Sequence, residues 1–135
     1  MRNIGAIVRT AECAVRRRYC FPSIEVHRDG GRYEDGGRCL LIFRLSDWKY
    51  PQTLEKLKER GFWAVGADMD GGDLYQADLK GPLVIVMGAE GKGISPLTKR
   101  MCDFCVRIPM KGKVSSLNVS VAAALLMYEA VRQRN

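Results

Sequence analysis

The feature that most constrains the fold is the run Leu83–Met87, five apolar residues without a polar interruption. An uninterrupted run of this length is typical of a strand buried on both faces of a parallel sheet. Around this run, expected helices and strands alternate along the chain. We expect a helix over Thr53–Arg60, strands over Phe62–Ala67 and Phe104–Ile108, turns over Asp68–Asp73, a helix opening at Ser95-Pro96 and a long helix over Asn118–Arg134. This alternation predicts an α/β domain whose mostly parallel sheet is flanked by helices.

A glycine-rich turn follows the apolar run directly, at Gly88, Gly91 and Gly93. Ligands of open parallel sheets bind at the carboxyl ends of the strands, where this turn must lie. The order of residues fits neither a dinucleotide-binding fingerprint nor a phosphate-binding P-loop. The alternative is a plain strand-to-helix turn, but such a turn rarely needs three glycines and an acid. We therefore interpret the turn as part of a ligand site.

A second loop joins the strand that ends at Ile108 to the last helix, and it is rich in Gly, Ser and Asn. Ser116 and Asn118 stand where the amides of a helix N-terminus and small polar side chains can hold a ligand. Helix capping by either residue is the alternative, and both roles are compatible.

A third pattern lies at the start of the chain, where Asn3 and Arg9 are six residues apart. On a helix that begins near Gly5, both side chains could point toward one pocket at its N-terminal end. Without other support, a capping Asn and a surface Arg are the better explanation.

Taken in order, the three patterns resemble motifs 1, 2 and 3 of the SpoU (TrmH-like) RNA ribose 2′-O-methyltransferases of the SPOUT superfamily. The matching stretches are Asn-x-Gly-x-x-x-Arg-Thr-Ala, Gly-x-Glu-Gly-x-Gly and Ile-Pro-Met-x-Gly-x-x-x-Ser-Leu-Asn-Val-Ser-Val-Ala. The resemblance covers Asn3–Glu12 and the chain from about Leu54 onward. The C-terminal part is most similar to the branch that modifies a guanosine of 23S ribosomal RNA.

The resemblance implies a sheet with a C-terminal trefoil knot, a homodimer in the cytoplasm, S-adenosyl-L-methionine as cofactor, no metal, and ribosomal RNA or transfer RNA as substrate. It implies a catalytic set made up of Arg9, Asn3, Glu90, Ser116 and Asn118. It implies a cofactor set made up of Gly88, Ala89, Gly91, Gly93, Ile108, Met110, Ser116 and Leu117. The family assigns activation of the ribose hydroxyl to Arg9. Because a guanidinium stays protonated, we expect Arg9 to clamp a phosphate and lower the hydroxyl pKa electrostatically.

The chain departs from the family pattern in two places. It starts at Met1-Arg2, where the family has a preceding strand, so we expect a single catalytic domain over residues 1–135 that is truncated at its front and impaired in activity. Residues 14–47 hold seven arginines, no lysine and the only histidine. Read in the +1 frame with suitable codons, Val15–Ser23 and Arg32–Phe43 become family-like, so we hypothesise a compensated frameshift. A divergent RNA-binding insert is the rival explanation.

The net charge of +7 favours a polyanionic partner, although many basic proteins bind no nucleic acid. Two other functions stay open at this point: a non-catalytic, basic RNA-binding module, and another α/β enzyme that binds a nucleotide through the glycine turn. The five cysteines are odd in number and irregular in spacing, as expected of reduced thiols. Cys102 and Cys105 have the spacing of half a zinc site, but we expect Cys105 to begin a buried strand instead.

Overall fold

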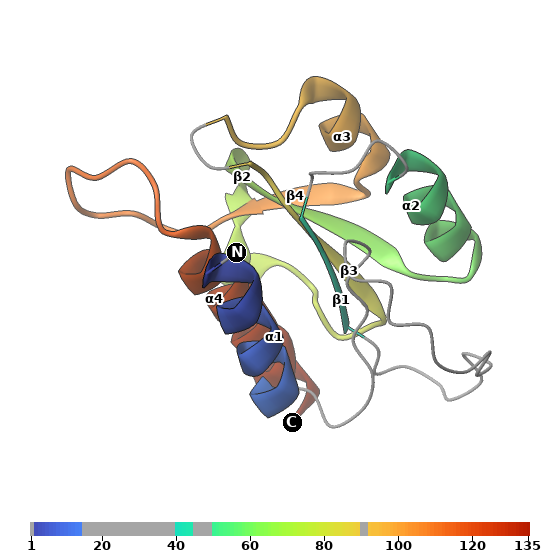
Figure 1. Cartoon of the computed structure of the whole chain (residues 1–135), viewed down its shortest axis with the longest axis horizontal. Coiled ribbons are helices and arrows are strands. Elements are labelled where there is room, and N and C mark those ends of the chain that lie inside the picture. The colour runs from blue at the N-terminus through green and yellow to red at the C-terminus, as the bar shows by residue number, and fades with distance from the viewer. Residues whose placement is uncertain (1, 15–39, 45–49, 90–91) are drawn as a thin grey trace.

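The computed structural model describes residues 2–14, 40–44, 50–89 and 92–135 (Figure 1). Most of the arginine-rich stretch, and with it the frameshift hypothesis, lies outside these residues. The helices are α1 (Arg2–Ala14), α2 (Tyr50–Glu59), α3 (Pro96–Met101) and α4 (Val119–Arg134), with a 3-10 turn, η1 (Leu74–Gln76). The strands are β1 (Leu40–Arg44), β2 (Trp63–Asp73), β3 (Leu83–Met87) and β4 (Phe104–Arg107).

The described strands form one parallel sheet in the order β1-β3-β2-β4, so the predicted α/β class is confirmed. β3 lies between β1 and β2, with Leu83 opposite both Leu40 and Trp63. Every residue of β3 is buried, which explains why its sequence is continuously apolar rather than alternating.

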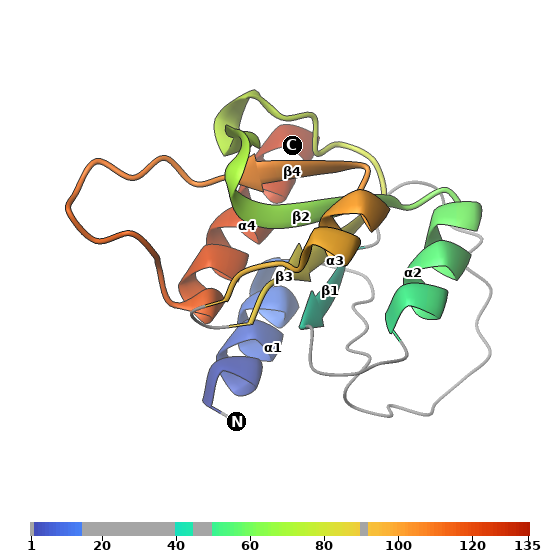
Figure 2. The same ribbon diagram turned by 90° about the horizontal axis from the view of Figure 1, so that it is seen from above.

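Helices cover both faces of the sheet (Figures 1 and 2). On one face, Ile7 and Ala11 of α1 and the buried side of α4 share a core with Ile85 and Met87. On the other face, Leu54 of α2 packs with Val84 and Val86. Alternate residues of β3 thus enter opposite cores, and the three layers leave the carboxyl ends of the strands uncovered at one edge.

The predicted caps of the later helices are confirmed. The Ser95 side chain accepts a hydrogen bond from the Thr98 amide, with Pro96 in the first turn of α3. The Asn118 side chain accepts from the Ser120 amide at 2.9 Å and begins α4. Both residues satisfy backbone amides that the first turn of a helix leaves without an intrahelical partner.

The expected start of the first helix near Gly5 is wrong, because α1 begins at Arg2. Asn3 therefore lies within the helix. Six residues at 3.6 per turn place Asn3 and Arg9 roughly 120° apart around the axis and about 9 Å apart along it. The two side chains therefore leave different faces of α1.

The expected turn over Asp68–Asp73 is also wrong in part, because β2 continues to Asp73. The pairing with β4 shifts register inside this stretch, so that Ala67 and Gly72 both lie opposite Val106. The strand passes close to β4 here: a Cβ on Gly71 would lie 2.6 Å from the backbone of Cys105. The glycines that suggest a turn instead permit an irregular strand against its neighbour.

Within the described ranges, no helix is long and apolar enough to cross a membrane. α4 nevertheless has apolar side chains on both sides. Leu126 and Met127 are buried, whereas Val121, Leu125 and Tyr128 are exposed. The outer side of this helix is thus more apolar than a solvent-facing surface requires.

Candidate cofactor and RNA methylation site

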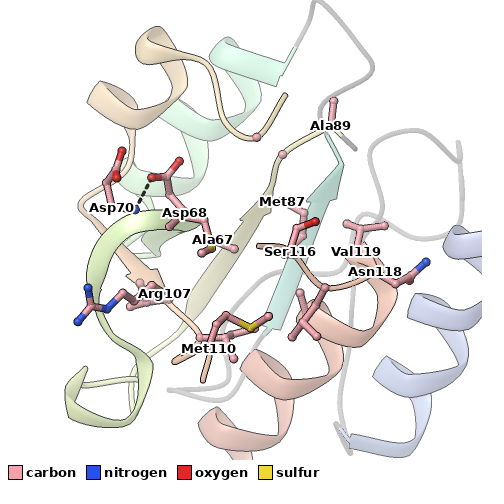
Figure 3. A pocket seen from close by; sticks show the side chains of 17 residues that line it. Ala67, Asp68, Asp70, Met87, Ala89, Arg107, Met110, Ser116, Asn118 and Val119 are labelled. Atoms are coloured by element: carbon pink, nitrogen blue, oxygen red, sulfur yellow. Dashed lines mark hydrogen bonds between the residues drawn. The ribbon is translucent and has the colours of Figure 1, made fainter. Parts of the chain in front are cut away.

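A cavity of about 530 Å³ opens at the carboxyl ends of β2, β3 and β4, beside the N-terminus of α4 (Figure 3). It is lined by residues of β2, of the ends of β3 and β4 and the loops that follow them, and of the first turn of α4: Ala67, Asp68, Met69, Asp70, Met87, Gly88, Ala89, Gly93, Val106, Arg107, Ile108, Met110, Ser116, Leu117, Asn118, Val119 and Ala122. The glycine turn after β3 (residues 88–93) and the Ser-Leu-Asn turn before α4 (residues 115–118) therefore face a single cavity.

The glycine turn is closed by its own backbone. The Gly93 amide donates to the Ala89 carbonyl at 3.0 Å, and the Lys92 amide donates to the same oxygen at 3.2 Å. Gly93 has φ = 64°, a conformation that favours glycine. A Cβ on Gly88 would lie 2.3 Å from the Gly93 carbonyl carbon, so the two ends of the turn meet more closely than any other residue would allow.

The Ser-Leu-Asn turn is exposed from Lys111 to Asn118. Asn118 ends it by accepting hydrogen bonds from the amide and the hydroxyl of Ser120, the latter at 2.6 Å. The capping alternative for Asn118 thus holds, and the same residue also lines the cavity. Ser116 points toward the end of β3 and the glycine turn (Figure 3).

The structure places the predicted residues unevenly. Of the predicted cofactor set, Gly91 lies outside the described residues, and the following line the cavity: Gly88, Ala89, Gly93, Ile108, Met110, Ser116 and Leu117. Of the predicted catalytic set, Ser116 and Asn118 line the cavity and Glu90 lies outside the described residues. Asn3 and Arg9 are on α1, which packs along α4, and neither belongs to the lining. Asn3 is half-buried, whereas Arg9 is exposed. Their roles stay predictions.

The wall at Ala67–Asp70 belongs to the part of the cavity that the predicted site residues leave out, as do Met87, Val106, Arg107, Val119 and Ala122. The Asp68 carboxylate is almost buried and lies 2.8 Å from the Lys99 ammonium of α3. It also accepts from the Asp70 amide at 2.9 Å, the bond drawn in Figure 3. The hydrogen bond from Lys99 to Asp68 raises the pKa of that lysine. Because the two partners are 31 residues apart in the sequence and lack a local motif, no sequence signal reveals this pair.

Cys102 and Cys105 lie next to Gly66 of β2, and Cys105 is close to Asp68 of this wall. The prediction that Cys105 begins a strand is close to the structure, since β4 begins one residue earlier. Burial is the main reason that the pKa of the Cys102 thiol is raised to about 12, and burial also raises the pKa of Cys105. Both sulfurs are within about 3 Å of the point that a Cβ on Gly66 would occupy, so a glycine there makes room for them. Protonated, poorly nucleophilic thiols are expected at these positions.

The sequence is similar to those of known proteins. The sequence model of the SpoU rRNA Methylase family matches residues 1–128. The chain is 44% identical over 135 residues to the 23S rRNA (guanosine-2′-O-)-methyltransferase RlmB of Pseudomonas putida, covering 98% of this chain and 54% of the relative. It is 57% identical over 137 residues to the protein of the same name in Shewanella oneidensis, covering 98% of this chain and 55% of the relative. The chain thus spans about half the length of these curated relatives.

Solved structures agree with the sequence comparison. The SpoU methyltransferase AviRb of Streptomyces viridochromogenes, crystallised with AdoMet, matches with a TM-score of 0.68 and 26% identity, over 98% of this chain and 55% of that one. The TrmH/SpoU tRNA-modifying enzyme of A. aeolicus matches with a TM-score of 0.68 and 28% identity, over 98% of this chain and 68% of that one. From the family match, the relatives and the fold together, the chain belongs to the SpoU rRNA methylase family.

Proposed function

We propose that this chain carries out the methyl-transfer part of an S-adenosyl-L-methionine-dependent 2′-O-methylation of a ribose in ribosomal RNA. The observation that carries the proposal is the single cavity onto which the glycine turn and the Ser-Leu-Asn turn both open. The names of the relatives supply the reaction and favour a guanosine of 23S ribosomal RNA as its target. Transfer RNA is the alternative substrate, in view of the A. aeolicus enzyme.

The residues present fit such a cofactor. A cavity of about 530 Å³ falls within the range of roughly 300–1,000 Å³ that small-molecule sites occupy. Its floor is apolar, with Met87, Val106 and Ile108, which suits the faces of a purine ring. The close approach of Gly88 to Gly93 brings backbone rather than side chains to the cavity edge. Residues 88–93, 108–110 and 116–117 would hold the cofactor, mostly through backbone groups.

When bound, S-adenosyl-L-methionine supplies a methyl group already activated on a sulfonium. The protein therefore has mainly to bring the ribose hydroxyl into line and keep it there. In our proposal Ser116 and Asn118 orient the ribose at the cavity, with Glu90 assisting from the glycine turn. By the family resemblance, Asn3 belongs to the same orienting set, from the first turn of α1.

Arg9 acts from the RNA side in this proposal. Its exposed position on α1 suits a contact with a substrate phosphate better than a contact inside the cavity. A guanidinium there can stabilise the developing oxyanion while the phosphate or water accepts the proton. Arg9→Ala should abolish methyl transfer and leave the affinity for S-adenosyl-L-methionine within about twofold of wild type. Wild-type turnover by that variant would remove Arg9 from the mechanism.

The decisive experiment is transfer of a tritiated methyl group to unmodified ribosomal RNA and transfer RNA, with calorimetric titration of S-adenosyl-L-methionine in parallel. Binding of the cofactor with label incorporated at a ribose 2′-oxygen is the expected result. If the chain binds RNA but no cofactor, it is a non-catalytic RNA-binding module instead. Binding of ATP or NAD in place of S-adenosyl-L-methionine would assign the cavity to another nucleotide.

We further propose the trefoil knot and the cytoplasmic homodimer that the family resemblance implies. The knot is supported by the two turns that face each other across the cavity, since a threaded C-terminal segment would bring them together. The dimer is supported by the exposed apolar residues of α4, Val121, Leu125 and Tyr128, which a second copy would cover. Light scattering tests the dimer: Leu125→Glu should shift the mass to that of one chain. An experimental structure tests the knot.

A further inference from the structure

Four exposed cations lie on, or next in sequence to, the segments that line the cavity. Arg107 is itself part of the lining, Lys92 adjoins Gly93 on the glycine turn, and Lys111 follows Met110. Lys113 lies three residues before Ser116 on the same loop as Lys111. This loop extends away from the body of the fold (Figures 1 and 2).

These four cations have no ion pair among the described residues, a property that they share with Lys56 and Lys80, so their position at the cavity is what distinguishes them. Elsewhere, Arg132 lies 2.8 Å from Glu129 and Lys58 lies 3.4 Å from Asp103. An unpaired exposed cation keeps its counterions, and it can exchange them for a phosphate at little cost.

The other charges that face the cavity do not cancel this excess. Asp68 and Asp70 line its wall, and the Lys99 ammonium lies between them at 2.8 and 3.4 Å. The loop from Lys111 to Asn118 has no acidic residue. Glu90 offsets Lys92 on the glycine turn, so positive charge prevails on the sides formed by β4 and the long loop.

We propose that Lys92, Arg107, Lys111 and Lys113 form one RNA-phosphate surface. It holds the backbone on either side of the nucleotide whose ribose enters the cavity. The inference rests on the proposed function, because a ribose at this cavity brings its flanking phosphates to the rim. The cavity selects the hydroxyl, and the rim provides affinity without sequence information, as phosphate contacts do. Electrostatic steering toward the rim also raises the rate of encounter.

The test compares two double variants of equal charge. Lys111→Gln with Lys113→Gln removes two rim cations, and Lys56→Gln with Lys80→Gln removes two exposed lysines of α2 and of the segment before β3, outside the lining. Binding of a labelled 20-nucleotide single-stranded RNA is measured between 50 and 200 mM salt, without cofactor. Removal of one cation that binds a phosphate should reduce the salt slope by about 0.7, which corresponds to roughly fivefold in affinity at 0.1 M salt.

We therefore expect the salt slope of the rim variant to fall by about 1.4 and its affinity to fall roughly 25-fold, while the control changes less than twofold. Thermal unfolding and the dissociation constant for S-adenosyl-L-methionine should match wild type in both variants, because neither lysine of the rim pair lines the cavity. Equal reductions in the two variants, or an unchanged slope in the rim variant, would overturn the proposal. Failure of the wild type to bind S-adenosyl-L-methionine would count against the proposed function, and the RNA titrations would still decide the surface.

Discussion

Gly88 is the position where one methyl group should most affect the cavity. In Gly88→Ala, the new Cβ would lie 2.3 Å from the carbonyl carbon, 2.5 Å from the carbonyl oxygen and 2.7 Å from the Cα of Gly93. Carbon atoms at rest are about 3.5–4.0 Å apart, so the turn must open by about 1 Å. All three contacts are with backbone, so no side chain can rotate away.

The magnitude follows from what opening the turn disrupts. Overpacking of a close contact costs about 1–3 kcal/mol, and movement of Gly93 weakens its 3.0 Å hydrogen bond to Ala89. Gly93 is exposed and Ala89 is only half-buried, so the turn can yield without disturbing the core. We therefore expect the change to appear mainly as a loss of cofactor affinity, about 5- to 150-fold for 1–3 kcal/mol.

Calorimetry with S-adenosyl-L-methionine measures the loss of cofactor affinity, and urea unfolding measures any loss of stability. The matched control is Gly72→Ala, because a Cβ at Gly72 meets nothing within 4 Å and should leave the affinity within twofold. If Gly88→Ala has both wild-type affinity and wild-type stability, the close approach of the two glycines does not shape the cavity. If stability falls while affinity stays, the turn is rigid and the argument about where the strain appears is wrong.

Three further outcomes are expected. Gln133→Leu removes the acceptor of a buried backbone amide, which should lower the free energy of unfolding by about 1–3 kcal/mol in urea titrations. The hydrogen bonds from Arg132 lower the pKa of Glu129 from its ordinary 4.5 to about 2, so their stabilisation is complete above pH 4.5 and is lost as the pH falls toward 2. The free energy of unfolding should change less with pH across that range in Glu129→Gln than in the wild type. An equal pH dependence in both would contradict the assignment. Lys99→Met leaves the Asp68 carboxylate without its ion pair and should weaken cofactor binding several-fold in calorimetry, whereas Lys58→Met, which breaks the ion pair between α2 and Asp103, should not.

Local signals were sufficient for most of the fold. β3 could be predicted because burial on both faces demands an uninterrupted apolar run, and no other short element requires one. The helix starts at Ser95 and Asn118 could be predicted because an N-cap acts on amides two or three residues away. The two turns that line the cavity could also be predicted, because their glycine, serine and asparagine residues form local contacts within the same loop.

The errors lie where tertiary contacts override a local pattern. The glycines after Ala67 indicate a turn. Gly71 is needed for another reason, because a Cβ at this position of β2 would lie only 2.6 Å from the backbone of Cys105 in β4. A Gly at position 5 normally weakens a helix interior and therefore indicates a later start for α1 than Arg2. Packing of Ile7 and Ala11 into the core with α4 stabilises the helix nevertheless.

The two halves of the site should therefore respond differently to sequence change. The cavity is shaped by backbone turns that local hydrogen bonds and the absence of Cβ atoms stabilise, so most side-chain changes on its rim should leave its form intact. The rim itself consists of exposed cations that no ion pair among the described residues fixes, and each contributes to RNA affinity independently. Substitutions there should alter affinity in graded, additive steps, whereas a single methyl group at Gly88 should alter the cavity abruptly. This contrast separates residues that shape the cavity from residues that hold the RNA, and both can be measured on the same chain.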